Sequence, residues 1–206
     1  LQVLPSGHLV EVTRKDLVSQ YVGDTAIKTE RVINSAMGGI LFIDEAYSLI
    51  QGRGDNYGNE SVTELLKLLE DRKGKFVCIA AGYTREMTQF LDSNSGLKSR
   101  FTKTITFEDY KPEELMEIFR LYCSKEGYSI EPEAEAILKD LFTNMFENRA
   151  FDFGNGRDVR NLFGKVKSAV AGRAYSKMKE LIAGGAEKQA AYEGSKPKTI
   201  TKEDLL

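Results

Sequence analysis

The pattern of hydrophobic and polar positions changes about halfway along the chain. In the first half, short apolar runs alternate with stretches whose apolar residues recur at helical spacing, which is typical of parallel strands joined by helices. In the second half, the apolar residues recur at helical spacing throughout. We therefore predict a parallel-sheet α/β domain over residues 1–108, followed by a small all-α domain over residues 109–206.

Four segments of the first half are predicted as strands. Two are continuous apolar runs, as expected for strands buried on both faces, and the last alternates Thr and Lys with apolar residues, as expected nearer a sheet edge. The predicted strands are 8–12, 40–43, 76–81 and 102–107, the predicted helices are 13–20, 25–37, 60–71 and 84–91, and 51–59 is expected to be a loop.

The second half contains three stretches with helical periodicity. Pro112 and Pro132 each precede one of them, and proline suits the first position of a helix. A third and longer helix is predicted over 158–182, followed by a polar tail and one more turn at 202–206.

Composition narrows the class of protein without naming a function. The chain has 206 residues, with 29 basic and 31 acidic side chains and a net charge of −2, so its charge gives no reason to expect a nucleic acid or an anionic membrane as partner. It contains no apolar run of the length that spans a membrane. Cys78 and Cys123 lie too far apart for a zinc motif or a disulfide framework, which favours a reducing, cytoplasmic compartment.

The clearest candidate for chemistry is the pair Asp44-Glu45, which directly follows the apolar run 40–43. Ligands of open α/β sheets bind at the carboxyl ends of the strands. Asp44 would hold Mg²⁺ through water, because this ion prefers oxygen ligands and keeps several of its waters. Glu45 would activate an attacking water as general base. The alternative interpretation is a strand that ends in an ordinary polar turn.

Several segments, taken in order, resemble the AAA+ superfamily of ATPases. They are most similar to the branch that contains red-type Rubisco activase (CbbX/CfxQ), stage V sporulation protein K and the ATPases of type VII secretion. The resemblance implies a hexameric ring that binds ATP and Mg²⁺, hydrolyses ATP and remodels a client protein by threading it through a central pore. The segments that carry it are 7–12, 38–47, 80–83 and 96–101.

The resemblance implies a role for two regions that the periodicity leaves unexplained. Tyr21, Val22 and Gly23 match the pore loop, whose aromatic and aliphatic side chains grip an extended polypeptide. Arg100 matches the finger that reaches the γ-phosphate bound by the next subunit, a task that suits a permanently charged guanidinium. Without the resemblance, a buried tyrosine and a surface arginine would be the simpler interpretations.

The resemblance also assigns two groups of nucleotide sensors. Arg157, with Arg160 in reserve, matches the second sensor, at the start of the long helix in the lid. The first sensor is Asn in many relatives, but Tyr83 stands at that position here, so the role passes to Tyr83 or Thr84.

One element of the family pattern is missing from the sequence. No Gly-x-x-x-x-Gly-Lys-Ser/Thr loop occurs, and in the family this Walker A loop carries most of the grip on the β- and γ-phosphates. We therefore expect a fragment whose sheet has a gap or an arrangement that covers the gap. We also expect weak or no binding of ATP and Mg²⁺, and no ATP hydrolysis by the chain alone. The lack of an initiator Met also favours a fragment.

Two rival interpretations come from other functional classes. A non-catalytic AAA+-like scaffold would bind partners without nucleotide. A clamp-loader or helicase relative would act on DNA and would need a basic surface, which the net charge does not support. Under the preferred interpretation the partners are the other subunits of the ring and a protein client, Rubisco or a sporulation or secretion factor by resemblance. The compartment is then the cytoplasm or a plastid stroma.

Overall fold

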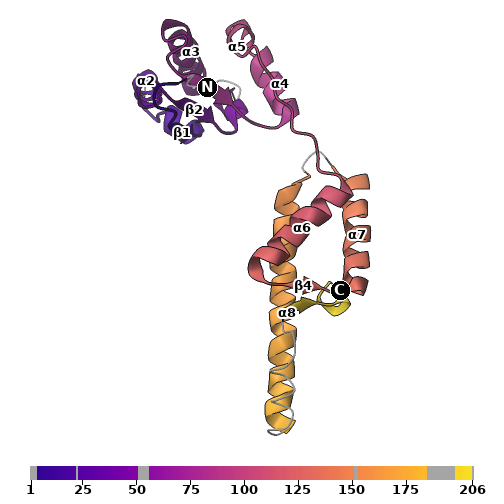
Figure 1. Ribbon diagram of the computed structural model, residues 1–206. Helices are drawn as coiled ribbons and strands as arrows, with labels where there is room; N and C mark the ends of the chain where they lie inside the picture. Colours follow the sequence, from indigo (N-terminus) through magenta and orange to yellow (C-terminus); the bar gives the residue numbers. More distant parts are fainter. Residues whose placement is uncertain (1–3, 22, 51–55, 151–152, 185–197, 206) are drawn as a thin grey trace. The chain divides into compact units, whose positions relative to one another are not determined.

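The computed structural model describes residues 4–21, 23–50, 56–150, 153–184 and 198–205 (Figure 1). The chain divides into two compact units, Leu1–Thr106 and Phe107–Leu206.

The described part of the first unit contains one parallel sheet of three strands, in the order β1 (Leu9–Val12), β2 (Ile40–Ile43) and β3 (Val77–Ala80). Ile40 of the middle strand lies opposite both Leu9 and Val77. These strands pair in sequence order, so no gap lies between the three of them. Among the described residues the sheet ends at β3, which pairs with β2 on one side.

The four predicted helices of the first unit are present, but the one predicted at 60–71 begins at Asn56, within the segment expected to be a loop. No helix was predicted at α5, where the side chain of Asn94 caps the first turn by accepting a hydrogen bond from Gly96 N at 2.8 Å, and Leu97 anchors the helix in the core. The elements are α1 (Arg14–Leu17), α2 (Asp24–Ser35), the 3₁₀ helix η1 (Ala46–Ile50), α3 (Asn56–Asp71), α4 (Thr84–Asp92) and α5 (Ser95–Arg100).

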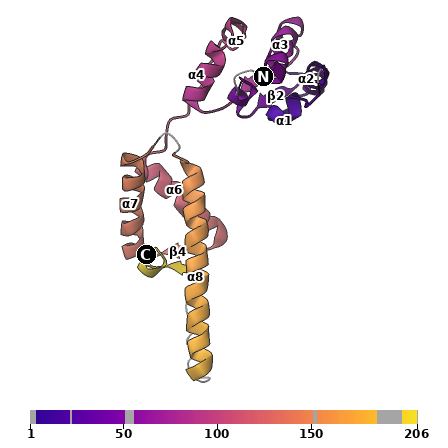
Figure 2. The ribbon, with the colours of Figure 1, turned by 180° about the vertical axis from the view of Figure 1, so that it is seen from behind.

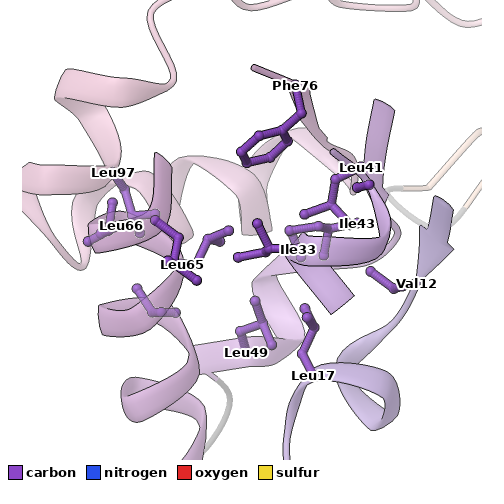
Figure 3. Packing of buried hydrophobic residues seen from close by; sticks show 14 of the residues in the cluster. Val12, Leu17, Ile33, Leu41, Ile43, Leu49, Leu65, Leu66, Phe76 and Leu97 are labelled. Carbon is purple, nitrogen blue, oxygen red and sulfur yellow. The ribbon is translucent and has the colours of Figure 1, made fainter. Parts of the chain in front are cut away.

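The core of the first unit is centred on β2. Leu41 and Ile43 of this strand are fully buried and belong to a cluster that draws side chains from α1, α2, η1, α3 and α5 (Figure 3). This packing fixes the strand whose carboxyl end carries Asp44. The helical members of the cluster that Figure 3 labels are Leu17, Ile33, Leu49, Leu65, Leu66 and Leu97.

Two predictions, about the run 76–81 and about the segment 102–107, are wrong. Residues 101–111 form neither helix nor strand, so the strand expected at 102–107 is absent, and Phe107 is 90% exposed. The run 76–81 is not buried on both faces, because Val77 and Ile79 are 38% and 42% exposed. Both differences have one cause. An alternating segment becomes a strand only beside a partner strand, and among the described residues β3 has one neighbouring strand.

The second unit is built on three helices, α6 (Pro112–Glu126), α7 (Pro132–Glu147) and α8 (Gly156–Gly184). α6 packs against both other helices, and the carboxyl-terminal half of α8 extends beyond them in both views (Figures 1 and 2). The ring of Phe119 lies 6.0 Å from that of Phe142 and 5.7 Å from that of Phe163, measured between centroids. Pro112 and Pro132 open their helices as predicted.

The last described residues of the chain close this unit with the predicted turn at 202–206 and with a short ladder that the periodicity did not predict. β5 (Thr199–Ile200) pairs in parallel with β4 (Ser129–Ile130), and the 3₁₀ helix η2 (Lys202–Asp204) follows. The guanidinium of Arg173 on α8 donates to both carboxylate oxygens of Asp204, at 2.9 and 2.8 Å, and to Thr199 O at 2.7 Å. The all-α prediction therefore needs one addition, a short parallel ladder held by an ion pair.

Candidate functional site

The carboxyl end of β2 leads straight into the candidate site. Asp44 occupies a turn directly after Ile43, and its backbone N donates to Val12 O at 2.8 Å. Two residues on, Ala46 N donates to Ala81 O at 3.0 Å. These two hydrogen bonds join the turn to the last residue of β1 and to the residue that follows β3. Asp44 and Glu45 therefore stand on a fixed backbone at the edge of the sheet where ligands bind.

Glu45 has an unusual backbone conformation. Its φ angle of 49° lies in the left-handed region, which costs a non-glycine residue on the order of 1 kcal/mol. Glu45 N donates to Asp44 Oδ1 at 3.0 Å, and Ser48 N donates to Glu45 O at 2.8 Å. The surrounding hydrogen bonds thus hold a strained residue whose side chain is exposed to solvent. Such strain gathers at functional sites, so it adds weight to Glu45 as a candidate.

An aromatic pair links this turn to the end of β3. The ring of Tyr47 lies 6.4 Å from that of Tyr83, and a Cβ atom added to Gly82 would come within 2.7 Å of the Tyr47 ring. Burial raises the pKa of Tyr47, and the negative charge of Glu45 and a hydrogen bond with its carboxylate raise that pKa further. Tyr47 therefore connects Glu45 with Tyr83. The sequence analysis assigned no role to Tyr47. The signal that could have pointed to it is its position, two residues after the acidic pair.

The two residues predicted as first sensor lie at this same edge. β2 and β3 are parallel with Ile43 opposite Ala80, so their carboxyl ends meet. Tyr83 is the N-cap of α4 and Thr84 is its first residue, and both are exposed. The structure therefore gathers Asp44, Glu45, Tyr83 and Thr84 at one edge of the sheet.

The donor set at this edge fits Mg²⁺ only as part of a larger complex. Asp44 is half-buried and forms no ion pair with any described residue. Within the described ranges, no group of three or more His, Cys, Asp or Glu residues is arranged to hold a metal. Mg²⁺ typically binds one or two carboxylates together with waters and nucleotide phosphates. The single Asp44 carboxylate therefore fits a water-mediated contact to a nucleotide-bound ion.

Arg100 lies at the end of α5 and contacts neither carboxylate of the acidic pair. Its Nη2 is 3.4 Å from Glu70 Oε2, and its Nη1 donates to Ser99 Oγ at 3.2 Å and to Gly96 O at 3.4 Å. Its Nε is buried and has no hydrogen-bond partner among the described residues. A buried donor without an acceptor is costly, and the other contacts are long. The guanidinium is therefore held by long contacts through Nη1 and Nη2, and its buried Nε is unpaired.

The lid arginines stand at the start of α8 in the second unit. Asn155, with φ of 54°, shapes the turn before this helix, because its Oδ1 accepts from Tyr110 N at 2.8 Å and its Nδ2 donates to Asp109 Oδ1 at 2.6 Å. Arg157 and Arg160 are both exposed. Neither guanidinium has a hydrogen bond or an ion pair with the described side chains. Both charges are therefore open to solvent within the lid.

Two of the three predicted pore-loop residues lie within the described residues, and Val22 lies outside them. Tyr21 is 72% exposed between α1 and α2, so it is not a core residue. Gly23 is the N-cap of α2 with φ of 83°, a conformation that favours glycine.

Across the described residues, no helix is both long and apolar enough to cross a membrane.

Comparison with known proteins agrees with this architecture. The sequence profile of the ATPase family associated with various cellular activities (AAA) matches residues 4–109, and that of the AAA lid domain matches residues 111–205. The chain belongs to the AAA family of ATPases. The predicted resemblance and the predicted fold, an α/β domain followed by a helical lid, are confirmed.

Individual relatives extend the comparison to the predicted branch. The chain is 46% identical over 174 residues to stage V sporulation protein K of Bacillus subtilis, covering 84% of this chain and 54% of that protein. It is 41% identical over 179 residues to the chloroplastic ribulose bisphosphate carboxylase/oxygenase activase of Cyanidioschyzon merolae, covering 85% and 60%. A RuvB mutant of Thermotoga maritima shares the fold at 19% identity, with a TM-score of 0.55, covering 80% of this chain and 47% of that chain. The chain thus spans 54% of the length of stage V sporulation protein K and 60% of the length of the activase.

Proposed function

We propose that this AAA family chain is the hydrolytic and lid portion of an ATP-driven motor that remodels a protein client. The observation that carries the proposal is the acidic pair Asp44-Glu45, fixed at the carboxyl end of the central strand in a profile-matched AAA domain. The similarity to an activase and to a sporulation protein supports a protein as the client. We further propose that the full-length protein assembles as a hexameric ring, and that Tyr21, Val22 and Gly23 line its pore.

Each residue at the edge of the sheet then has a role. Asp44 contacts Mg²⁺ through water, and Glu45 takes a proton from the water that attacks the γ-phosphate of ATP. Tyr83 or Thr84 reports the presence of that phosphate. Arg100 of a neighbouring subunit stabilises the charge that develops on the phosphate, an effect worth about a thousandfold in rate in related chemistry.

The lid arginines complete the proposed site. Arg157, with Arg160 in reserve, senses the same phosphate from the second unit. Their exposure and their lack of side-chain partners within the described lid support this role. The bacterial and chloroplastic relatives support the cytoplasm or a plastid stroma as the compartment.

The 206-residue chain alone should not turn over ATP. Its sequence has no Gly-Lys-Ser/Thr loop, and such a loop supplies most of the grip on the phosphates, so we also expect weak or no binding of ATP and Mg²⁺. A steady-state assay of phosphate release from the purified chain tests this directly. Turnover above that of a Glu45→Gln variant would contradict the proposal.

The decisive experiment uses the full-length protein. Glu45→Gln should lower ATP turnover by about 100-fold or more while ATP still binds, because the substitution removes the base and keeps the shape of the side chain. Glu117→Gln is the matched control, since this carboxylate is exposed on α6 of the second unit. The wild type should also unfold a fluorescent reporter protein in an ATP-dependent manner. A wild type that neither binds nor hydrolyses ATP would instead favour the non-catalytic scaffold.

A further inference from the structure

A pocket of about 710 Å³ in the first unit is lined by residues of α1, of the segment that leads to Tyr21, of α2 and of α3. Its lining includes Arg14 and Lys15 of α1, Lys28 of α2 and the side chains of Tyr21 and Tyr57. None of the described residues that line it is acidic. The pocket therefore combines positive charge with aromatic rings. We call it the Tyr21 pocket.

The walls of the Tyr21 pocket are fixed by side chains of α2. Lys28 Nζ donates to Lys15 O at 2.5 Å and to Val18 O at 3.0 Å. Thr29 Oγ1 donates to Leu17 O at 3.0 Å from a fully buried position. These hydrogen bonds hold the backbone of α1 and the segment leading to Tyr21. Less conformational freedom is therefore lost when a ligand binds.

The hydrogen bonds of Lys28 go to backbone carbonyls, which carry no net charge. Lys15 is exposed. One carboxylate lies close by, that of Asp16, but it already accepts hydrogen bonds from Thr13 N and Thr13 Oγ1. The bond from the Thr13 backbone is the main factor that lowers the pKa of Asp16, and the charges of Lys15 and Lys28 lower that pKa further. The positive charges of Lys15 and Lys28 thus stabilise the ionised form of a carboxylate near the pocket.

We propose that the Tyr21 pocket binds an acidic segment of the client polypeptide. Carboxylates of the segment pair with Lys15 and Lys28, and its side chains pack against Tyr21 and Tyr57. This inference deepens the proposed function, because it names the class of client segment on which the motor acts.

The arrangement of the charges favours a polypeptide over a small anion. Arg14 donates from Nη1 to Ser48 O at 2.7 Å, so one arm of its planar fork is committed to the protein. Lys15 and Lys28 come from two different helices and act as separate point charges. Carboxylates spaced along a chain suit this distribution, and tyrosine rings offer contact area that a small anion does not use.

The test measures binding of short fluorescent peptides to the 206-residue chain by anisotropy, without ATP. A Glu-rich peptide containing tyrosine should bind more tightly than Gly-Ser and Lys-rich peptides of the same length, and added salt should weaken it. Lys15→Glu should weaken the acidic peptide by about tenfold, and Tyr21→Ala by about threefold. Lys73→Glu is the matched control, because Lys73 is an exposed lysine of the same unit outside the pocket.

Three results would overturn the inference. They are equal binding of all three peptides, equal losses in Lys15→Glu and Lys73→Glu, and displacement of the peptide by inorganic phosphate at equal concentration, which would make the pocket a small-anion site. Since no step uses ATP, the outcome is separate from the proposed motor activity. If the full-length protein remodels a reporter while acidic peptides fail to bind, only the inference about the pocket falls.

Discussion

The second unit packs its aromatic core between three helices and closes it with the last described residues of the chain, whereas the first unit leaves β3 as an open edge of its sheet. Ile79 on that edge is 42% exposed, but Phe119, Phe142 and Leu138 of the lid are fully buried. The core of the lid follows ordinary packing rules. In the first unit, Glu45 has a strained backbone and Arg100 has an unpaired Nε, and both are candidate functional residues.

The largest effect should come from the aromatic core of the lid. Phe119→Ala removes a fully buried ring that contacts two others, so it should lower the free energy of unfolding of the lid by about 3–5 kcal/mol. Phe107→Ala is the control, because this ring is 90% exposed and its removal should change stability by about 0.5 kcal/mol or less. Native-state hydrogen exchange of amides in α6, α7 and α8 measures both. Similar losses for the two variants would show that the lid is not held by this core.

A slightly smaller effect should come from the ion pair that closes the lid. Burial acts to raise the pKa of Asp204, but hydrogen bonds from Arg173 and Thr201 outweigh it, so the pKa lies below the ordinary value of 3.8. A carboxylate whose pKa is lower in the folded state stabilises the fold above its unfolded pKa. That contribution is lost as the pH falls through the folded value.

Asp204→Asn should therefore destabilise the lid by about 3 kcal/mol near neutral pH, because it leaves the Arg173 charge without its partner. The cost should begin to shrink below about pH 4, where the carboxylate of the unfolded chain takes up a proton, and should disappear as the pH falls through the lower pKa of the folded state. Urea unfolding at a series of pH values measures this, with the exposed Asp140→Asn as control. A cost that stays constant down to low pH would mean that the charge of Asp204 is not what closes the lid.

The smallest effect should come from the open edge of the sheet. Ile79→Ala should cost about 1 kcal/mol or less in the 206-residue chain, since much of its side chain is already in water. Ile43→Ala, at a fully buried position on the neighbouring strand, should cost about 3 kcal/mol. Chemical denaturation of the two variants compares them. Equal costs would indicate that β3 is covered in solution.

The sequence predicted the centre of the site better than its surroundings. An apolar run of four residues between Gly39 and two carboxylates is a local signal, so β2 and the place of Asp44 at its end could be predicted. The strand expected at 102–107 failed because an alternating pattern does not reveal whether a partner strand is present.

Contacts between distant residues account for most of what the sequence could not show. β4 and β5 are two residues long and pair across about 70 positions, which leaves no periodicity to detect. The link from Glu45 through Tyr47 to Tyr83 depends on how two neighbouring strands end side by side. The contact of Arg100 with Glu70 joins α5 to α3, and the sequence pattern gave Arg100 a function but no resting partner.

The most direct test of an ATP site shared between subunits is a mixing experiment with the full-length protein. Glu45→Gln and Arg100→Ala should each abolish most ATP turnover alone, because every site in the ring lacks either the base or the finger. Mixed in equal amounts, the two variants should regain roughly a quarter of wild-type turnover, since some sites then combine an intact Glu45 with an intact Arg100 from the next subunit. Mixed rings that stay as inactive as the separate variants would contradict a site built from the two residues across a subunit boundary.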